Sequence, residues 1–235
     1  YFVLYHELSW QAYNLHDWGY NFLFSTGQSN NFSYKATLSR NSTDQQVFPR
    51  QGSDFTFSVQ LTPPYSLFRD PNLDYNSMSD QERYRWIEYH KWTFKGALYT
   101  KIVGDLILMA RAQFGYLGSY NKKWGYSPFE GYQVGGDGMS GYNTYGSEII
   151  ALRGYENYSL TPVNEDGVYS GHIYDKFTLE LRYPLVLQPS STIFALLFLE
   201  GGNCWDKIEI QSFRDQEIRW CRFEGYAPYG RSSWY

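Results

Sequence analysis

Apolar and polar residues alternate along several stretches of the chain, and this alternation is the clearest pattern in the sequence. Between residues 31 and 39, for example, Phe32, Tyr34, Ala36 and Leu38 are separated by polar side chains. A period of two is typical of β-strands that present one face to apolar surroundings and the other to water. The pattern predicts strands at residues 2–13, 31–39, 54–62, 91–98, 106–114, 177–185 and 192–205.

The length and spacing of these predicted strands favour a barrel in a membrane. They run for ~10 residues or more, whereas strands of globular sheets usually have ~5–6. Their polar faces carry Lys, Arg, Glu and Gln, as the wall of a water-filled lumen would. Short and long connections alternate, as turns and loops do in outer-membrane barrels. We therefore expect an all-β fold, an antiparallel transmembrane β-barrel of the outer-membrane type. A β-sandwich is the alternative that the pattern alone leaves open.

Composition narrows the choice of function. The chain has 24 Tyr, 16 Phe and 8 Trp among 235 residues. This aromatic content fits the interfacial girdles of outer-membrane barrels, and equally the sugar-stacking surfaces of a carbohydrate-binding protein. The net charge is −4 and no long basic run is present, so we expect no nucleic-acid partner. No stretch approaches the ~18 consecutive apolar residues of a membrane helix.

Nothing in the sequence indicates a catalytic or cofactor site. The four histidines share no ligand spacing: His6, His16, His90 and His172. The glycine run at residues 135–138 is not followed by the lysine of a phosphate-binding loop, so flexible backbone is the better interpretation. Cys204 and Cys221 are too few for a disulfide framework and lack metal-ligand spacing. We expect neither a cofactor nor a metal, and no enzymatic activity.

One motif stands out in the long stretch from about residue 118 to 173, where little regular pattern is found. It is Leu152-Arg153-Gly154-Tyr155. Loops longer than ~15 residues are usually functional or plugging rather than passive. An arginine in such a loop needs acceptors, and Glu180 lies on the polar face of the following predicted strand. On these residues alone, an ordinary surface arginine with unrelated acids is the alternative.

Glu200 is a second candidate acceptor, although its position in the strand is unusual. The residues that share its parity are apolar: Phe194, Leu196 and Phe198. The opposite face of that strand is apolar too. Because an unpaired buried charge is costly, an acid in such surroundings needs a partner.

Five motifs follow one another along the chain in the order found in the bacterial surface antigen family of outer-membrane assembly factors, and they resemble the barrel domain of that family. The central motif, Leu152-Arg153-Gly154-Tyr155, is similar to the signature of the family's sixth extracellular loop, an apolar residue followed by Arg-Gly-Phe/Tyr. The others are Phe48-Pro49-Arg50-Gln51-Gly52 (a periplasmic turn), the glycine run 135–138 with Gly141-Tyr142, Leu179-Glu180-Leu181 with Pro184, and Phe198-Leu199-Glu200-Gly201-Gly202 with Trp205. In the last motif, Glu200 stands where many members have Asp.

The resemblance covers most of residues 1–213 and implies a partial barrel, the middle strands of a larger one without its periplasmic POTRA domains. It implies a non-enzymatic factor in the cell outer membrane that folds and inserts nascent β-barrel proteins, in contact with lipids and with accessory lipoproteins. It also implies that Arg153 is held in the lumen by Glu180 and Glu200. A carbohydrate-binding surface protein and a passive porin-like channel are the alternative functions.

The alternation of apolar and polar residues ends after Phe213, and residues 214–235 are typical of neither a strand nor a loop. One permitted set of codons for residues 217–235, read from its second base, encodes a string that resembles the next hairpin of the family's barrel. We therefore expect a reading-frame error near residues 214–217 and a tail without selected structure.

Overall fold

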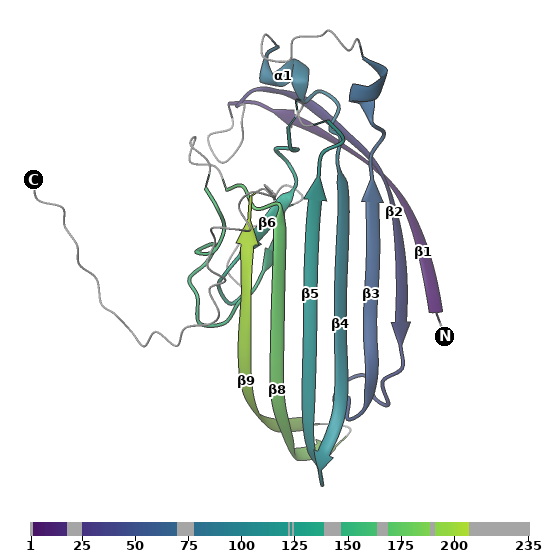
Figure 1. The fold of residues 1–235 in the computed structure, drawn as a ribbon, viewed down its shortest axis with the longest axis vertical. Helices are drawn as coiled ribbons and strands as arrows, with labels where there is room; N and C mark the ends of the chain where they lie inside the picture. Colours follow the sequence, from purple (N-terminus) through teal and green to yellow (C-terminus); the bar gives the residue numbers. More distant parts are fainter. Residues whose placement is uncertain are drawn as a thin grey trace, which may run out of the picture.

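Seven long antiparallel strands form one curved sheet in the computed structural model (Figure 1), in the order β1-β2-β3-β4-β5-β8-β9. The model describes residues 2–17, 25–69, 78–121, 123, 125–138, 147–163, 169–188 and 191–206. The strands are β1 (Phe2–Leu15), β2 (Gly27–Asn41), β3 (Gly52–Leu61), β4 (His90–Val103), β5 (Leu106–Gly118), β8 (Ile173–Gln188) and β9 (Ser191–Trp205). The predicted all-β antiparallel barrel fold is confirmed, as an incomplete barrel.

Little else in the described chain is regular. The sheet is accompanied by a 3-10 turn η1 (Tyr65–Phe68), a short helix α1 (Asp80–Arg83), and a parallel pair, β6 (Gly131–Val134) and β7 (Ser147–Ile150). Among the described residues, neither helix is long and apolar enough to cross a membrane. The pair β6–β7 lies within the stretch in which the sequence shows no pattern. Its strands have four residues each, too few for a period of two to be recognised.

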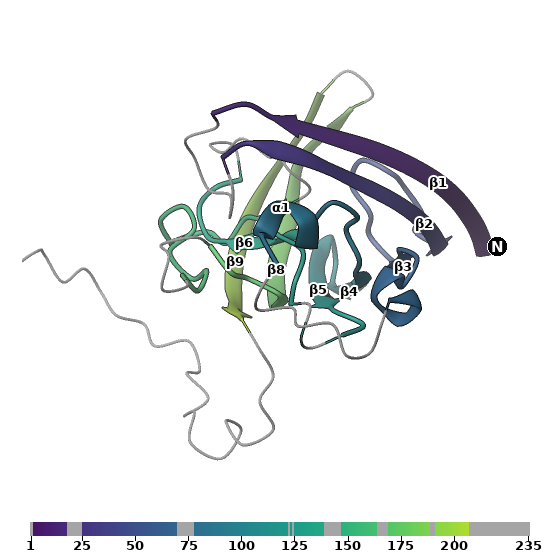
Figure 2. The same ribbon diagram turned by 90° about the horizontal axis from the view of Figure 1, so that it is seen from above.

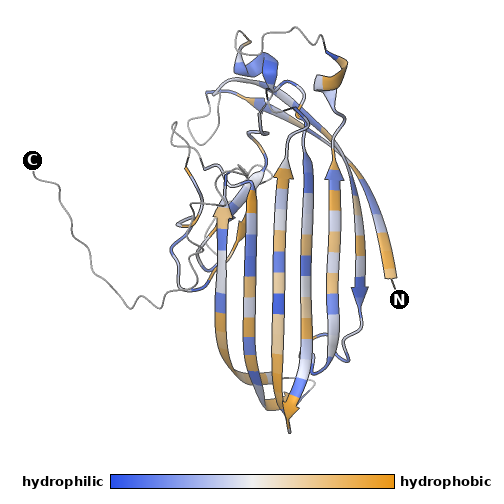
Figure 3. Ribbon diagram, viewed as in Figure 1, coloured by the Kyte–Doolittle hydropathy of each residue, from blue (hydrophilic) through white to orange (hydrophobic). Residues whose placement is uncertain are grey.

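The strand register separates two faces of the sheet, and hydropathy alternates along each strand accordingly (Figure 3). Met109 of β5 pairs with Glu180 of β8 on one face, and Ala110 pairs with Leu179 on the other. We call the face with Glu180 the inner face and the face with Leu179 the outer face. The outer face exposes large apolar side chains: Trp92, Phe94, Leu98, Phe114, Phe177, Leu179, Leu197 and Leu199. The inner face carries the polar residues of the alternation.

The packed core lies inside the curl of the sheet, not against its apolar outer face. Its buried residues are Leu15, Ile87, Tyr89, Leu117, Phe129, Tyr132, Val134, Ile150, Leu152, Tyr174 and Cys204. Several of them come from the connection between β5 and β8. We call the described parts of residues 119–172 the plug segment, and the space inside the curl the lumen. Viewed from above, the sheet curls around this space (Figure 2).

The turn between β2 and β3 closes the other end of the curl. Phe48 is buried, and its ring centroid lies 5.1 Å from that of Phe194 on the inner face of β9. The Asp44 carboxylate accepts hydrogen bonds from the backbone N–H groups of Arg50 (2.8 Å) and Gln51 (3.2 Å), which fixes the turn. The Phe-Pro-x-x-Gly motif therefore begins with an aromatic ring that reaches across the lumen.

Two features of the sequence prediction lie outside the described residues. They are the tail 214–235, together with residues 207–213 before it, and the Gly141-Tyr142 part of the glycine-rich motif.

Candidate functional site

Arg153 sits at the second position of a tight turn in the plug segment. The Tyr155 N–H donates to the Leu152 carbonyl oxygen over 3.3 Å, which closes the turn. Gly154, at the third position, has φ = 91°. Turns of this kind require a positive φ there, which glycine adopts without steric cost. Leu152 is fully buried in the luminal core, so the turn is anchored on one side while the Arg153 side chain projects from it.

The glycine-rich run that precedes the motif holds the turn from behind. Leu152 N–H donates to the Gly136 carbonyl oxygen (2.9 Å), and Gly136 N–H donates to the Tyr155 carbonyl oxygen (3.1 Å). Gly136 has φ = 79°, and an added Cβ would lie 1.7 Å from Oδ1 of Asn157. The positive φ and the crowding by Asn157 both favour glycine at position 136, where the run supports the turn through its backbone. The two motifs that follow one another in the sequence form one unit in space.

The guanidinium of Arg153 lies between the two carboxylates. Its Nη2 is 2.7 Å from Oε1 of Glu180 and 2.7 Å from Oε1 of Glu200. The backbone N–H of Arg153 also donates to Oε2 of Glu200, over 3.0 Å. The side chains of Glu180 and Glu200 are only 7% and 4% exposed. Hydrogen bonds between ionised partners are roughly twice as strong as neutral ones, so this contact ties the turn to β8 and β9.

Three further residues of β8 belong to the same network, and sequence reasoning did not assign them to it. Nζ of Lys176 lies 3.3 Å from Oε1 of Glu200, and Oγ1 of Thr178 donates to the same oxygen over 3.2 Å. Nη2 of Arg182 lies 2.6 Å from Oε2 of Glu180. The Arg153 cluster therefore consists of Arg153, Lys176, Thr178, Glu180, Arg182 and Glu200. The alternation of inner and outer residues along β8 could have identified these three residues, since they lie two or four positions from Glu180.

The cluster matches each acid with a cation from the wall and one from the plug. Glu180 pairs with Arg182 as well as Arg153, and Glu200 with Lys176 as well as Arg153. The hydrogen bonds to Glu200 and Glu180 raise the pKa of Arg153 above its ordinary value, against the lowering effect of partial burial. Arg153 is therefore a permanent cation. Since the cations and carboxylates of the cluster pair with one another, the geometry can fasten a loop to a wall.

Two of the apolar residues that share the parity of Glu200, Phe194 and Phe198, have luminal partners as well. Phe194 packs against Phe48, and the ring of Phe198 lies beneath the Arg153 guanidinium. Both faces of β9 are apolar, as the sequence indicates. The turn between β2 and β3 partly covers Phe194, whereas Leu196 and Phe198 remain about two-fifths exposed. The Glu200 carboxylate is nevertheless buried, because its partners Arg153, Lys176 and Thr178 surround it.

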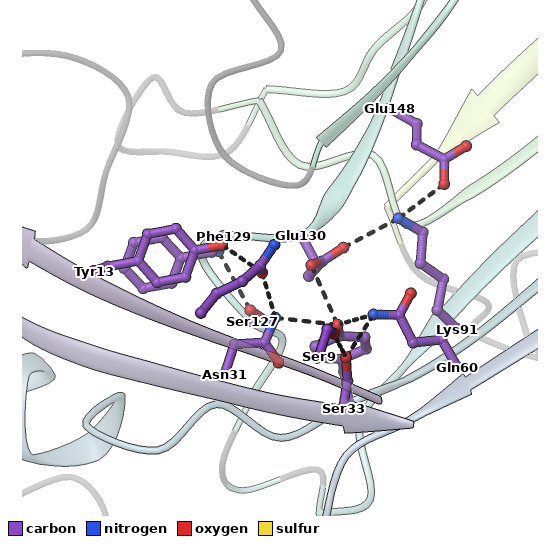
Figure 4. Close-up of polar contacts among 12 residues, drawn as sticks. Ser9, Tyr13, Asn31, Ser33, Gln60, Lys91, Ser127, Phe129, Glu130 and Glu148 are labelled. Carbon is purple, nitrogen blue, oxygen red and sulfur yellow. Dashed lines mark hydrogen bonds and ion pairs between the residues drawn. The ribbon is translucent and has the colours of Figure 1, made fainter. Parts of the chain in front are cut away.

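A second ionic cluster lies in the lumen, against β4 (Figure 4). Nζ of Lys91 is 3.1 Å from Oε2 of Glu130 and 3.1 Å from Oε1 of Glu148, both in the plug segment. The side chains of Lys91 and Glu130 are 6% and 5% exposed. We call these three residues the Lys91 cluster. Sequence reasoning missed it, because Glu130 and Glu148 lie where no period marks a face.

The two acids of the Lys91 cluster respond differently to their surroundings. Burial raises the pKa of Glu130 above its ordinary value, and the attraction of Lys91 offsets this only in part. Burial also raises the pKa of Glu148, but Lys91 and Lys95 outweigh that effect and bring it below its ordinary value. Glu148 is therefore ionised at neutral pH.

The comparison with known families agrees with these motifs. A model of the Omp85 superfamily domain matches residues 5–221. The chain belongs to the Omp85 superfamily. The resemblance that the motifs carry is thereby confirmed at the level of the superfamily. No curated protein sequence matches the chain.

Among solved structures, this Omp85 chain is similar in fold to "The crystal structure of BamA from Haemophilus ducreyi lacking POTRA domains 1-3". The TM-score is 0.54 and the sequence identity 20%, and the match covers 80% of this chain and 32% of that chain. The chain thus spans about a third of the length of that structure. The likeness supports the barrel fold of the Omp85 domain.

One buried thiol of the Omp85 domain lies beside the plug segment. Cys204 is a free cysteine, 5% exposed, and its Sγ is 3.8 Å from the carbonyl oxygen of Tyr132 on β6. Burial makes such a thiol less reactive, because the thiolate is the reactive form and is disfavoured in apolar surroundings. Among the described residues, no three His, Cys, Asp or Glu side chains gather in a way that could hold a metal ion.

Proposed function

We propose that this Omp85 chain is part of a BamA-type assembly factor that folds nascent β-barrel proteins and inserts them into the outer membrane. The observation that carries the proposal is the ionic tie between Arg153, on a glycine-supported turn, and the buried acids Glu180 and Glu200. The arrangement brings together four of the five motifs that the sequence shares with the family of assembly factors, namely the described part of the glycine run, the Arg153 turn and the strands of Glu180 and Glu200. In this function the protein is not an enzyme and needs no cofactor.

The outer face supports a position in the outer membrane. On β8 and β9, Phe177, Leu179 and Leu199 are about half exposed and Leu197 is 70% exposed. Such residues are stable in contact with lipid and unfavourable in water. The backbone groups between neighbouring strands are paired, as a structure in hydrocarbon requires. The partners that follow are outer-membrane lipids, nascent β-barrel proteins and accessory assembly lipoproteins.

Arg153 acts, in this proposal, as a latch that keeps the plug segment inside the lumen. Without it, Glu180 and Glu200 still pair with Arg182 and Lys176 on the wall. The wall therefore stays intact while the turn loses its ion pairs with β8 and β9, and the plug keeps the hydrogen bonds of its backbone there, from the N–H of residue 153 to Glu200 and from Lys176 to the Ala151 carbonyl oxygen. Breaking a fully buried ion pair costs ~3–5 kcal/mol. Because the Arg153 side chain is about one-third exposed, we expect a smaller loss of stability here.

The experiment replaces Arg153 with alanine in the intact protein in its native membrane. We expect a lower temperature of unfolding, read from heat-modifiable gel migration, and a lower yield of assembled β-barrel substrates. Arg85→Ala is a matched control, since Arg85 is an exposed arginine in the connection between α1 and β4, and the hydrogen bond that its backbone carbonyl oxygen accepts from Asn30 N–H is kept in the alanine variant. Unchanged migration and unchanged substrate yield for Arg153→Ala would refute the latch.

Two other outcomes would replace the proposal. Normal substrate assembly together with an altered single-channel conductance of Arg153→Ala would indicate a passive porin-like channel. A protein that is soluble and folded without detergent would indicate a carbohydrate-binding surface protein, and a sugar-binding assay would follow.

A further inference from the structure

The two ionic clusters of the lumen have opposite polarity. In the Arg153 cluster the plug segment contributes the cation, and the wall contributes the acids Glu180 and Glu200. In the Lys91 cluster the plug contributes the acids Glu130 and Glu148, and β4 of the wall contributes the cation. The plug is therefore attached to the wall at two places, to β4 and, on the far side of β5, to β8 and β9.

The Lys91 cluster continues into a polar network along β1, β2 and β3 (Figure 4). The Tyr89 hydroxyl donates to Oε1 of Glu130 over 3.2 Å and accepts from Nε2 of Gln60 over 2.7 Å. The same Gln60 amide nitrogen donates to Oγ of Ser33, over 2.9 Å. Nearby, the ring of Tyr13 on β1 stacks on Phe129 of the plug, with centroids 4.4 Å apart. Glu130 is therefore held by several strands at once.

The two acids lie near the same end of the β6–β7 ribbon. Glu130 immediately precedes β6, and Glu148 lies in β7, paired with Tyr132 of β6. The ribbon ends with the pair Val134 and Ile150. Beyond it, Gly136 and Leu152 form the bridge that supports the Arg153 turn. A short two-stranded rod thus has the Lys91 cluster at one end and the Arg153 turn at the other.

We propose that Lys91 is a positioning residue that seats the β6–β7 ribbon against β4 and thereby presents Arg153 to Glu180 and Glu200. The inference rests on the proposed role of Arg153 as a latch, and it does not require assembly activity. Without Lys91, the two acids of the ribbon lose their shared cation, and burying them beside each other is unfavourable. The ribbon then moves towards water, and the turn at its far end leaves the two luminal carboxylates.

The native thiol of Cys204 reports this movement. It is covered by Tyr132 of β6, so it becomes accessible when the ribbon leaves its seat. We would measure the rate of maleimide labelling of the folded, membrane-embedded intact protein with Cys204 as its only cysteine. For Lys91→Met we expect a rise of roughly tenfold or more, because local opening controls access to a buried group. Lys91→Arg should keep most of the protection.

A matched control is available on the same strand. Lys95 lies on the same inner face as Lys91, but it is about half exposed and its Nζ is 3.9 Å from Glu148. Because this contact is long and partly solvated, Lys95→Met should raise the labelling rate much less than Lys91→Met. If Lys91→Met does not assemble, Glu148→Gln gives a milder test, because it leaves the Lys91–Glu130 pair in place, and we expect a smaller rise in rate.

A double substitution separates positioning from a second, independent attachment. If Lys91 acts through Arg153, Lys91→Met with Arg153→Ala labels about as fast as Lys91→Met alone. The positioning role would be refuted if the fold-increases in labelling rate of the two single variants multiplied in the double variant. Full protection of Cys204 in both Lys91→Met and Glu148→Gln would refute it too. These outcomes are distinct from a failure of the proposed function. That failure is read from substrate assembly in Arg153→Ala, whatever the labelling rate.

Discussion

The guanidinium carbon of Arg153 lies 3.7 Å above the centre of the Phe198 ring. Phe198 shares the inner face of β9 with Glu200, so the strand supplies both a carboxylate and an aromatic surface to the same cation. Contacts of this kind contribute ~0.5–1 kcal/mol when exposed and ~2 kcal/mol or more when desolvated. The seat of Arg153 is thus partly aromatic, which accounts for an apolar neighbour beside a buried acid.

We expect Phe198→Leu to weaken the latch while keeping an apolar side chain in the lumen. The loss should be about 1 kcal/mol in the free energy of unfolding, since only the interaction with the ring is removed. It should disappear in an Arg153→Ala background, as measured by urea unfolding in bilayers. Phe177→Leu is the control, because Phe177 lies exposed on the outer face. Equal losses with and without Arg153 would show that the ring acts only by packing.

Gly154 lies in the Arg153 turn and Gly136 supports the turn from outside. Alanine substitutions at the two positions should destabilise the protein to different extents. At Gly154 no atom lies within 4 Å of an added Cβ, so Gly154→Ala brings only the strain of its positive φ, about 1–3 kcal/mol. At Gly136 the same strain is joined by crowding from Asn157, whose side chain has to rotate away and whose Cα lies 3.1 Å from the added Cβ. Gly136→Ala should therefore lower the unfolding temperature further than Gly154→Ala. Gly154→Asn should be milder than Gly154→Ala, because asparagine tolerates a positive φ better.

The order of these three variants can be read from heat-modifiable gel migration on one scale. A Gly136→Ala protein as stable as the parent would mean that the glycine run does not support the turn.

Phe48→Ala should destabilise the end of the lumen opposite the plug. The ring is buried against Phe194, and removing a buried phenylalanine typically costs ~3–5 kcal/mol. The neighbouring Val47 is exposed, so Val47→Ala should change the free energy of unfolding by less than about 0.5 kcal/mol. Urea unfolding in bilayers measures both. If the two variants are equally stable, the contact between Phe48 and Phe194 does not hold the curl of the sheet.

Glu148 should contribute stability at neutral pH that is lost in acid. Its pKa is held below the ordinary value by Lys91 and Lys95 against the effect of burial. A carboxyl of this kind stabilises the folded state above its unfolded pKa, about 4.3, and the contribution disappears as pH falls through the lower folded value. Glu148→Gln should therefore be less stable than the parent at pH 7, and the difference should shrink below about pH 4.

Glu130, in the same cluster, should show the opposite dependence of stability on pH. Its pKa is raised, so its charged form opposes folding, and acidification removes that cost between the raised folded pKa and the ordinary one. Urea unfolding midpoints between neutral and acidic pH would separate the two acids. Parallel pH profiles for Glu148→Gln and the parent would contradict the assignment of the acid loss to Glu148.

The strands were predictable because one physical constraint acts along their whole length. Every second residue of β5 and β8 faces the apolar side, so the alternation survives even where single residues vary. The same parity placed Glu180 on the inner face. It also holds for Lys176 and Arg182, whose part in the Arg153 cluster could have been derived from it.

The alternation of apolar and polar residues could not predict the structure of the plug segment. The strands β6 and β7 are short, parallel and largely buried, so Tyr132, Val134 and Ile150 carry no period that marks a face. Glu130 and Glu148 meet Lys91 only through the path of the chain in the lumen, which depends on contacts distant in sequence. The resemblance of the motifs supplied the partners of Arg153, but it contained no information about this second cluster.

The opposite polarity of the two clusters specifies which way round the plug sits. A plug turned end for end would bring Arg153 towards Lys91, and Glu130 and Glu148 towards Glu180 and Glu200. Both encounters place like charges together, and such juxtapositions cost several kcal/mol. The charges therefore discriminate between two orientations of the same segment, in addition to attaching it. Reversing the charges of one cluster alone, on plug and wall together, would remove that discrimination, because both ends of the inverted plug would then meet a wall of opposite charge.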